Sequence, residues 1–148
     1  MNYLGNKDIL KNHKTAFLCS RQCTAQVVLK SFDWAREQRE AKNCIICGNH
    51  SQIEKDVFGI LLRGDQPLIL VLARGMKTRW EPAIEAAIEK NRLLVISSFP
   101  KEVKRITKET AEMRNENILS LADEITIGYK TQGGQLEKLL LNHTFTAL

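Results

Sequence analysis

The chain has 148 residues, 43% hydrophobic and 26% charged, which is the composition of a globular protein with one domain. No apolar run approaches the ~20 residues that a membrane-spanning helix needs, so we expect that the chain does not span a membrane. Twenty-two Lys and Arg residues against seventeen Asp and Glu residues give a net charge of +5, which is compatible with a polyanionic partner. The N-terminal residues lack the apolar core of a secretory signal, so we expect a cytoplasmic protein.

Five apolar runs alternate with amphipathic stretches along the chain. The runs, each predicted to be a strand, are 15–19, 43–47, 68–73, 93–97 and 125–128. Helices are predicted from Thr24 to about Lys42, from Ser51, from Pro82, through Arg114 to Leu121, and through Leu136 to Leu140.

Strands that are apolar throughout are buried on both faces, and their alternation with helices gives parallel strands joined by right-handed crossovers. The predicted fold class is therefore α/β, a doubly wound, Rossmann-like parallel sheet of about five strands with helices on both faces. We expect residues 1–14 to form an N-terminal arm, 15–142 the single domain and 143–148 a tail.

In such a fold, ligands bind outside the carboxyl ends of the strands, near the point where the strand order reverses. The loops that follow the five predicted strands are small or polar, and two of them carry an Arg. They are Ser20-Arg21, Gly48-Asn49-His50-Ser51, Arg74-Gly75, Ser98 and Thr131-Gln132-Gly133-Gly134. We expect these loops to converge on one rim.

The last of these loops lies between a predicted strand and a predicted helix. A Gly-bearing loop that leads into a helix N-terminus presents free backbone N–H groups and the positive end of a helix dipole, which suits a phosphate. Because a single Gly pair is a weak motif, Gly133-Gly134 can equally be a tight turn with no ligand.

The four cysteines are spaced C-x3-C and C-x2-C, which is close to a zinc-binding pattern. Cys44 and Cys47, however, lie in a predicted strand, where alternate side chains leave on opposite faces, and no Gly or Pro separates them. Free thiols are the default in a reducing compartment, so we expect neither a metal nor any other cofactor.

The order and spacing of the loop motifs over residues 4–141 resemble the DNA-processing protein family (DprA, also called Smf). Cys19-Ser20-Arg21 stands at the family's Gly-Ser-Arg signature, and the segment from Cys47 to Glu54 at its Ser-Gly-Leu-Ala-x-Gly-Ile-Asp motif. Further matches are Leu4-Gly5-Asn6, Leu72-Ala73-Arg74-Gly75-Met76, Ser97-Ser98-Phe99-Pro100, Arg114-Asn115-Glu116-Asn117 and Thr131 to Leu136. Departures are Glu116 for the second Arg of Arg-Asn-Arg, Cys19 and Gln52 for Gly, and Phe58 for His.

The resemblance implies a Rossmann-like domain that binds single-stranded DNA through phosphate contacts. Arg21, Arg74 and Arg114 are candidates because guanidinium grips phosphate in a bidentate manner; the alternatives are surface ion pairs or a solvated helix face. His50 is a candidate base or phosphate contact, or only a polar loop residue. The complete candidate set is Ser20, Arg21, Gly48, Asn49, His50, Arg74, Gly75, Ser98, Arg114, Asn115, Thr131, Gly133 and Gly134.

Three functions follow from these residues. The first is a module that binds single-stranded DNA, with no catalytic residue. The second is a sensor that binds a nucleotide without turnover. The third is an enzyme that cleaves nucleoside monophosphates and resembles the cytokinin-activating phosphoribohydrolases of the same superfamily. The loop from Thr131 to Glu137, however, lacks the Pro and the Gly-Thr pair of their motif. Because dimers are common in this superfamily, a homodimer is also expected.

Overall fold

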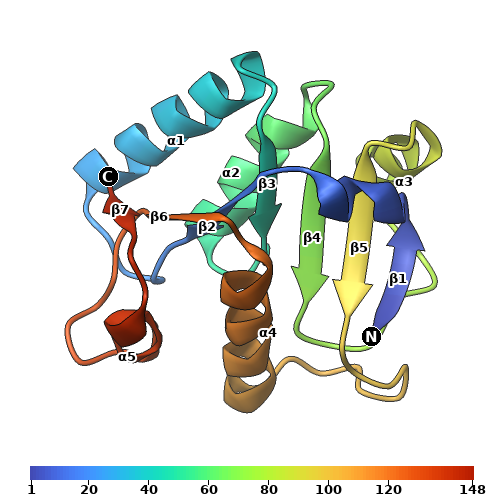
Figure 1. Cartoon of the computed structure of the whole chain (residues 1–148). Helices are drawn as coiled ribbons and strands as arrows, with labels where there is room; N and C mark the ends of the chain where they lie inside the picture. The colour runs from blue at the N-terminus through green and yellow to red at the C-terminus, as the bar shows by residue number, and fades with distance from the viewer.

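The computed structural model describes all 148 residues as one α/β domain (Figure 1). Its strands are β1 (Asn2–Gly5), β2 (Lys14–Leu18), β3 (Cys44–Cys47), β4 (Leu68–Leu72), β5 (Leu93–Ser97), β6 (Glu124–Ile127) and β7 (Thr146–Ala147). Its helices are α1 (Ala25–Glu40), α2 (Gln52–Leu62), α3 (Pro82–Glu89), α4 (Lys108–Leu121) and α5 (Gln135–Leu139), with the 3-10 turns η1 (Lys7–Lys11) and η2 (Leu140–Asn142).

All the strands form one sheet in the order β1-β5-β4-β3-β2-β6-β7. The five predicted strands are its central strands, β2 to β6; they run parallel, and each boundary lies within one residue of its prediction. The doubly wound α/β prediction is confirmed, but the sheet has seven strands rather than five. The two additional strands are β1, which pairs antiparallel with β5, and β7, which pairs parallel with β6.

The additional strands lie in the segments predicted to be an arm and a tail. Both are short and mostly exposed, so they lack the apolar run that identifies a buried strand in a sequence. The turn η1 also belongs to the domain, because its Ile9 is only 3% exposed and packs in the core. The structure therefore extends the domain into residues 1–14 and 143–148.

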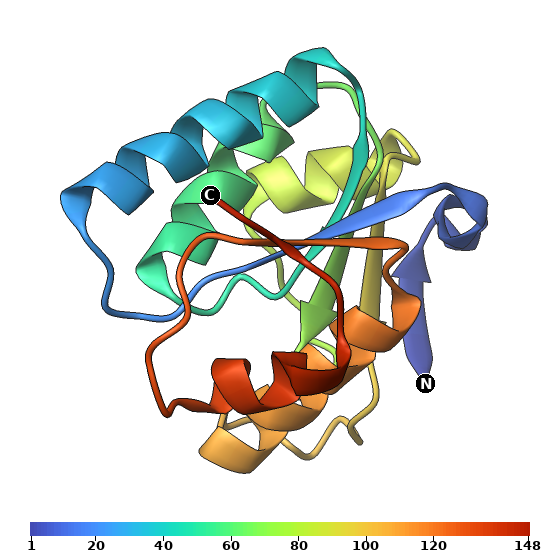
Figure 2. The ribbon, with the colours of Figure 1, turned by 60° about the vertical axis from the view of Figure 1, so that its left-hand side comes forward.

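Helices cover the sheet on both faces (Figures 1 and 2). On one face, α1, α2 and α3 pack through Trp34, Val57 and Ile84; on the other, α4 and α5 pack through Ile118 and Leu136. The buried ring of Trp34 stacks on Phe17, with 5.1 Å between the ring centroids. None of the helices is both long and apolar enough to span a membrane.

The order of the strands fixes where the sheet changes direction. From β2 the chain proceeds through β3 and β4 to β5, and α4 then returns it across the opposite face to β6, on the other side of β2. The strand order thus reverses between β2 and β6. A ligand crevice is therefore expected at the carboxyl ends of these two strands.

Candidate functional site

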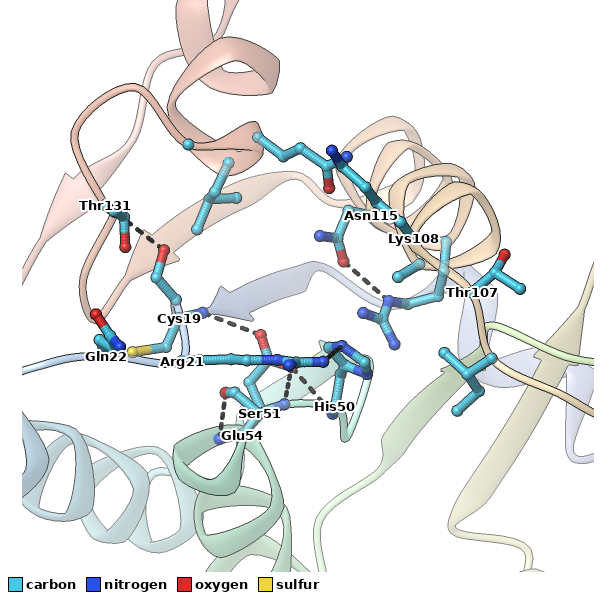
Figure 3. Close-up of a pocket in the computed structure, with 17 residues that line it drawn as sticks. Cys19, Arg21, Gln22, His50, Ser51, Glu54, Thr107, Lys108, Asn115 and Thr131 are labelled. Carbon is cyan, nitrogen blue, oxygen red and sulfur yellow. Dashed lines mark hydrogen bonds between the residues drawn. The ribbon is translucent and has the colours of Figure 1, made fainter.

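A hollow of about 590 Å³ opens at the carboxyl ends of β2, β3 and β6, where the strand order reverses (Figure 3). The loop after β2, the start of α2, the first half of α4 and the loop before α5 form its walls. Its lining residues are Cys19, Ser20, Arg21, Gln22, His50, Ser51, Glu54, Ile106, Thr107, Lys108, Ala111, Arg114, Asn115, Thr131, Gly134, Gln135 and Leu136. We call this space the switch-point hollow.

The Glu54 carboxylate organises the floor of the switch-point hollow. It is 4% exposed and accepts backbone N–H groups from Cys19 at 3.0 Å, His50 at 3.0 Å and Ser51 at 3.2 Å. Ser51 caps α2, and its hydroxyl accepts the Glu54 N–H, which completes a capping box. An anion that approaches this end of α2 therefore meets a carboxylate rather than a set of free N–H groups.

Arg114 was expected to contact phosphate, and the structure places it in the hollow but 98% buried. Its Nη1 donates to the Gly48 carbonyl at 3.0 Å and its Nε to Oδ1 of Asn115 at 2.9 Å. Burial lowers the pKa of this guanidinium, and the negative charge of Glu54 opposes the shift. The structure shows no hydrogen bond from its Nη2 to another protein atom, and Arg114 is one of the residues that line the hollow.

Gly48 is one of the predicted binding residues. The neighbour that requires a glycine is Arg114, because a Cβ at position 48 would lie 2.6 Å from its Nε. Gly48 therefore lies behind the lining of the hollow. Asn49, the next predicted residue, does not line the hollow either; it has a left-handed φ of 52° at the turn that leads to His50.

Arg21 and His50 lie side by side at the mouth of the hollow (Figure 3). Nη2 of Arg21 is 3.3 Å from Nε2 of His50, and the Arg21 side chain is exposed. Burial lowers the pKa of His50, and the positive charges of Arg114, Arg21 and Lys55 lower it further. The lowered pKa favours the neutral imidazole, whose Nε2 can accept a hydrogen bond from Arg21 when the ring proton is on Nδ1.

The loops after β2 and β6 are bonded to each other across the crevice. Oγ of Ser20 accepts the Thr131 N–H at 3.1 Å, and the Ser20 N–H donates to the Tyr129 carbonyl at 2.8 Å. Both hydroxyl-bearing residues line the hollow. These bonds fix the distance between the two walls of the switch-point hollow.

The glycine loop before α5 does not offer the free N–H groups that its sequence suggests. The Gly133 N–H donates to Glu137 at 3.1 Å, and Lys130 binds the other oxygen of that carboxylate at 3.1 Å. These bonds hold the pKa of Glu137 below its usual value. Of the two glycines only Gly134 lines the hollow, whereas Gly133 is exposed, with a φ of 73°. α5 has only five residues, so its dipole is weak.

The predicted residues of the loops after β4 and β5 lie outside the switch-point hollow. Arg74 lines a second hollow of about 430 Å³, together with Met76, Lys77, Thr78, Arg79, Lys101, Glu102 and Lys104. Gly75 packs against the backbone of Pro100, where a Cβ would collide, and Ser98 accepts a hydrogen bond from Asn117 at 3.1 Å. The expectation of a single rim is corrected: the loops form two hollows.

One loop connects the second hollow, which we call the basic-loop hollow, to the first. The segment between β5 and α4 gives Lys101 and Lys104 to the basic-loop hollow, and Ile106 and Thr107 to the switch-point hollow. Lys108, the first residue of α4, also lines the switch-point hollow. Lys108 and Glu54 line the switch-point hollow but are not in the predicted set of binding residues. The match of Glu54 to the Asp that ends the family motif was a signal for the carboxylate, whereas no motif in the sequence points to Lys108.

The four cysteines are free thiols. Cys44 and Cys47 face opposite cores of the sheet, as their spacing in a strand predicts. Burial raises the pKa of Cys44 to about 11 and that of Cys19 to about 12, and it raises the pKa of Cys47 as well. The buried thiols are thus protonated at neutral pH.

The geometry defines a class of protein: a Rossmann-like α/β domain with a basic hollow at the switch point of its sheet. The chain belongs to the DNA recombination-mediator protein A family, whose model matches residues 1–139. No curated protein matches the chain.

Two solved structures of DNA processing protein A share the fold. The protein from Helicobacter pylori, whose structure describes a single-stranded DNA binding mode, is 17% identical, with a TM-score of 0.76 over 98% of this chain. The protein from Streptococcus pneumoniae is 22% identical, also with a TM-score of 0.76 over 98% of this chain. The present chain spans 69% of the first structure and 53% of the second.

Proposed function

We propose that this domain binds single-stranded DNA along the two connected hollows at the carboxyl edge of its sheet. The observation that carries the proposal is the charge of the switch-point hollow. Arg21, Lys108 and Arg114 line it and supply positive charge there. The one carboxylate in the lining, Glu54, is already engaged by three backbone N–H groups.

The basic-loop hollow extends this positive surface. Arg74, Lys77, Arg79, Lys101 and Lys104 line it, with Glu102 as its only acidic residue. A flexible polyanion gains affinity from each phosphate that such residues neutralise, because counterions are released. Two basic hollows joined by one loop therefore suit a strand of several nucleotides better than they suit a single small anion.

Family membership and the Helicobacter pylori relative support the proposal. The family is named for DNA recombination mediation, and the Helicobacter pylori structure concerns a single-stranded DNA binding mode. Because this chain spans 53% of the Streptococcus pneumoniae structure, our proposal concerns DNA binding by this domain and does not extend to recombination mediation.

Binding without turnover is the simpler use of these residues. A phosphoribohydrolase needs a carboxylate that can reach the sugar. The Glu54 carboxylate already accepts hydrogen bonds from three backbone N–H groups. Glu137 is bound by Lys130 and the Gly133 N–H and does not line the switch-point hollow. A nucleotide sensor is a second candidate, because 590 Å³ lies within the usual size range of small-molecule pockets.

Fluorescence anisotropy of a labelled oligonucleotide at two salt concentrations tests the proposal. Arg21→Ala should weaken binding about tenfold and reduce the salt dependence, because one phosphate contact is lost. Arg36→Ala is the matched control, since Arg36 is an exposed arginine on α1 that pairs with Asp33. No binding at low salt would contradict the DNA proposal; stabilisation by a nucleoside phosphate in a thermal-shift assay would then favour the sensor.

The cellular setting and the assembly state are also proposals. We place the protein in the cytoplasm, where its family partner, DNA, and a reducing environment for four free thiols are both found. A homodimer remains a prediction from the superfamily resemblance. Light scattering coupled to size-exclusion chromatography measures the mass and tests it.

A further inference from the structure

The Arg21–His50 pair at the mouth of the switch-point hollow is held together in an unusual way. An arginine donor lies 3.3 Å from a ring nitrogen, which must present its lone pair for a hydrogen bond to form. The contact therefore requires a neutral imidazole with its proton on Nδ1. A protonated ring would instead place two cations in contact.

Charged groups face His50 from every element around it. Arg21 comes from the loop after β2, Arg114 from α4 and Lys55 from α2, and all three disfavour the protonated ring. The single opposing charge is Glu54, which accepts the backbone N–H of His50. Burial and these three cations together keep the pKa of His50 below its usual value in the free protein.

An anion at the mouth of the hollow would reverse this balance. A phosphate oxygen that enters between Arg21 and His50 can accept hydrogen bonds from both side chains, provided that Nε2 carries a proton. The negative charge then favours the protonated ring, so the pKa of His50 rises on binding. The proton comes from solvent, and no covalent bond of the ligand changes.

We propose that His50 takes up one proton when a phosphodiester binds beside Arg21, so that the domain binds single-stranded DNA more tightly as the pH falls. This inference rests on the proposed function and assigns His50 a role as a phosphate contact that depends on its protonation. Arg21 then acts as the fixed charge of the site and His50 as the adjustable one.

The sign and range of the effect follow from linkage. Above the pKa of His50 in the complex, neither state holds the extra proton and affinity is independent of pH. Between the higher pKa of the complex and the lower pKa of the free protein, each unit of decrease in pH tightens binding by up to about tenfold. Below both values affinity is constant again. A phosphodiester stays ionised throughout, so it contributes no titration of its own.

The test measures the affinity of the intact chain for an oligothymidylate without terminal phosphates, from about pH 5.5 to about pH 8 at constant ionic strength. Wild-type protein should bind about fivefold or more tightly at the acid end, and His50→Gln should remove this dependence. His50→Lys should bind tightly across the whole range. His13→Gln is the control, since His13 pairs with Glu124 and lies outside the hollow.

Thermal melts check that each variant is folded before its affinity is compared. NMR of the His50 ring should show its pKa rising when the oligonucleotide is added. A flat wild-type profile, or a pH dependence that persists in His50→Gln, overturns this inference and leaves the proposed function standing. Failure of the wild-type chain to bind at any pH overturns both.

Discussion

The two hollows at the carboxyl edge of the sheet present positive charge in different ways. In the switch-point hollow, Arg114 and Glu54 are buried and their hydrogen bonds to the backbone fix their positions. In the basic-loop hollow, Arg79, Lys101 and Lys104 are exposed at the surface of loops. A fixed, partly dehydrated charge selects a geometry, whereas exposed lysines add attraction that salt screens. The domain thus combines one hollow whose charges are held in fixed positions with another whose charges lie on exposed loops.

Removal of the Glu54 carboxylate should have the largest effect on stability, because this carboxylate organises the floor of the switch-point hollow. Glu54→Ala leaves three backbone N–H groups, two of them buried, without an acceptor and the Arg114 charge without its nearby counterion. We expect a loss of about 3–5 kcal/mol of unfolding free energy, measured by urea denaturation. Glu116→Ala, which removes an exposed carboxylate on α4, should change stability by less than about 0.5 kcal/mol. Equal effects of the two variants would contradict the role of Glu54.

A methyl group at position 48 should have the next largest effect. Gly48→Ala places a Cβ 2.6 Å from Nε of Arg114, and the displaced guanidinium loses its bond to the backbone. We expect a cost of about 1–3 kcal/mol in unfolding free energy, with weaker DNA binding. The matched control is Gly59→Ala, inside α2, where a Cβ meets no atom within 4 Å. That change should stabilise the protein by about 0.5–1 kcal/mol, since alanine favours helix. A stable, fully active Gly48→Ala variant would argue against the packing described.

Neutralisation of the basic-loop hollow should have the smallest effect and should leave stability unchanged. In the double variant Lys101→Gln/Lys104→Gln, we expect the slope of log affinity against log salt for single-stranded DNA to fall by about 0.7 per lost phosphate contact. The matched control is Lys30→Gln/Lys90→Gln, which removes two exposed lysines from α1 and the end of α3. An unchanged slope in the first variant would exclude the basic-loop hollow from the DNA path.

The central sheet was predictable because burial on both faces leaves continuous apolar runs such as Leu68–Leu72 and Leu93–Ser97. The edge strands β1 and β7 were not, since half-solvated or very short strands carry no such run. Edge pairing depends on where the chain returns in space, and no local pattern encodes that.

The sequence predicted many of the residues that line the site, but not their burial or the paths of the loops. Ser20, Arg21, His50, Arg114, Asn115, Thr131 and Gly134 do line one hollow. The sequence could not show that Arg114 is buried, because its bond to Gly48 joins residues that are 66 positions apart. It also could not place Arg74 and Ser98 outside the hollow, because the paths of the loops beyond β4 and β5 decide this.

The contact between Gly48 and Arg114 restricts how the sequence of this domain can evolve at these two positions. A bulkier residue at position 48 is tolerable only after the side chain at position 114 has become shorter, and a shorter side chain there leaves the Gly48 carbonyl without its donor. A substitution at either position alone should therefore destabilise the domain more than a matched pair of substitutions does, so the effects of the two positions are not additive. A library that randomises either position alone should return the original residue, whereas one that randomises both together can find replacements.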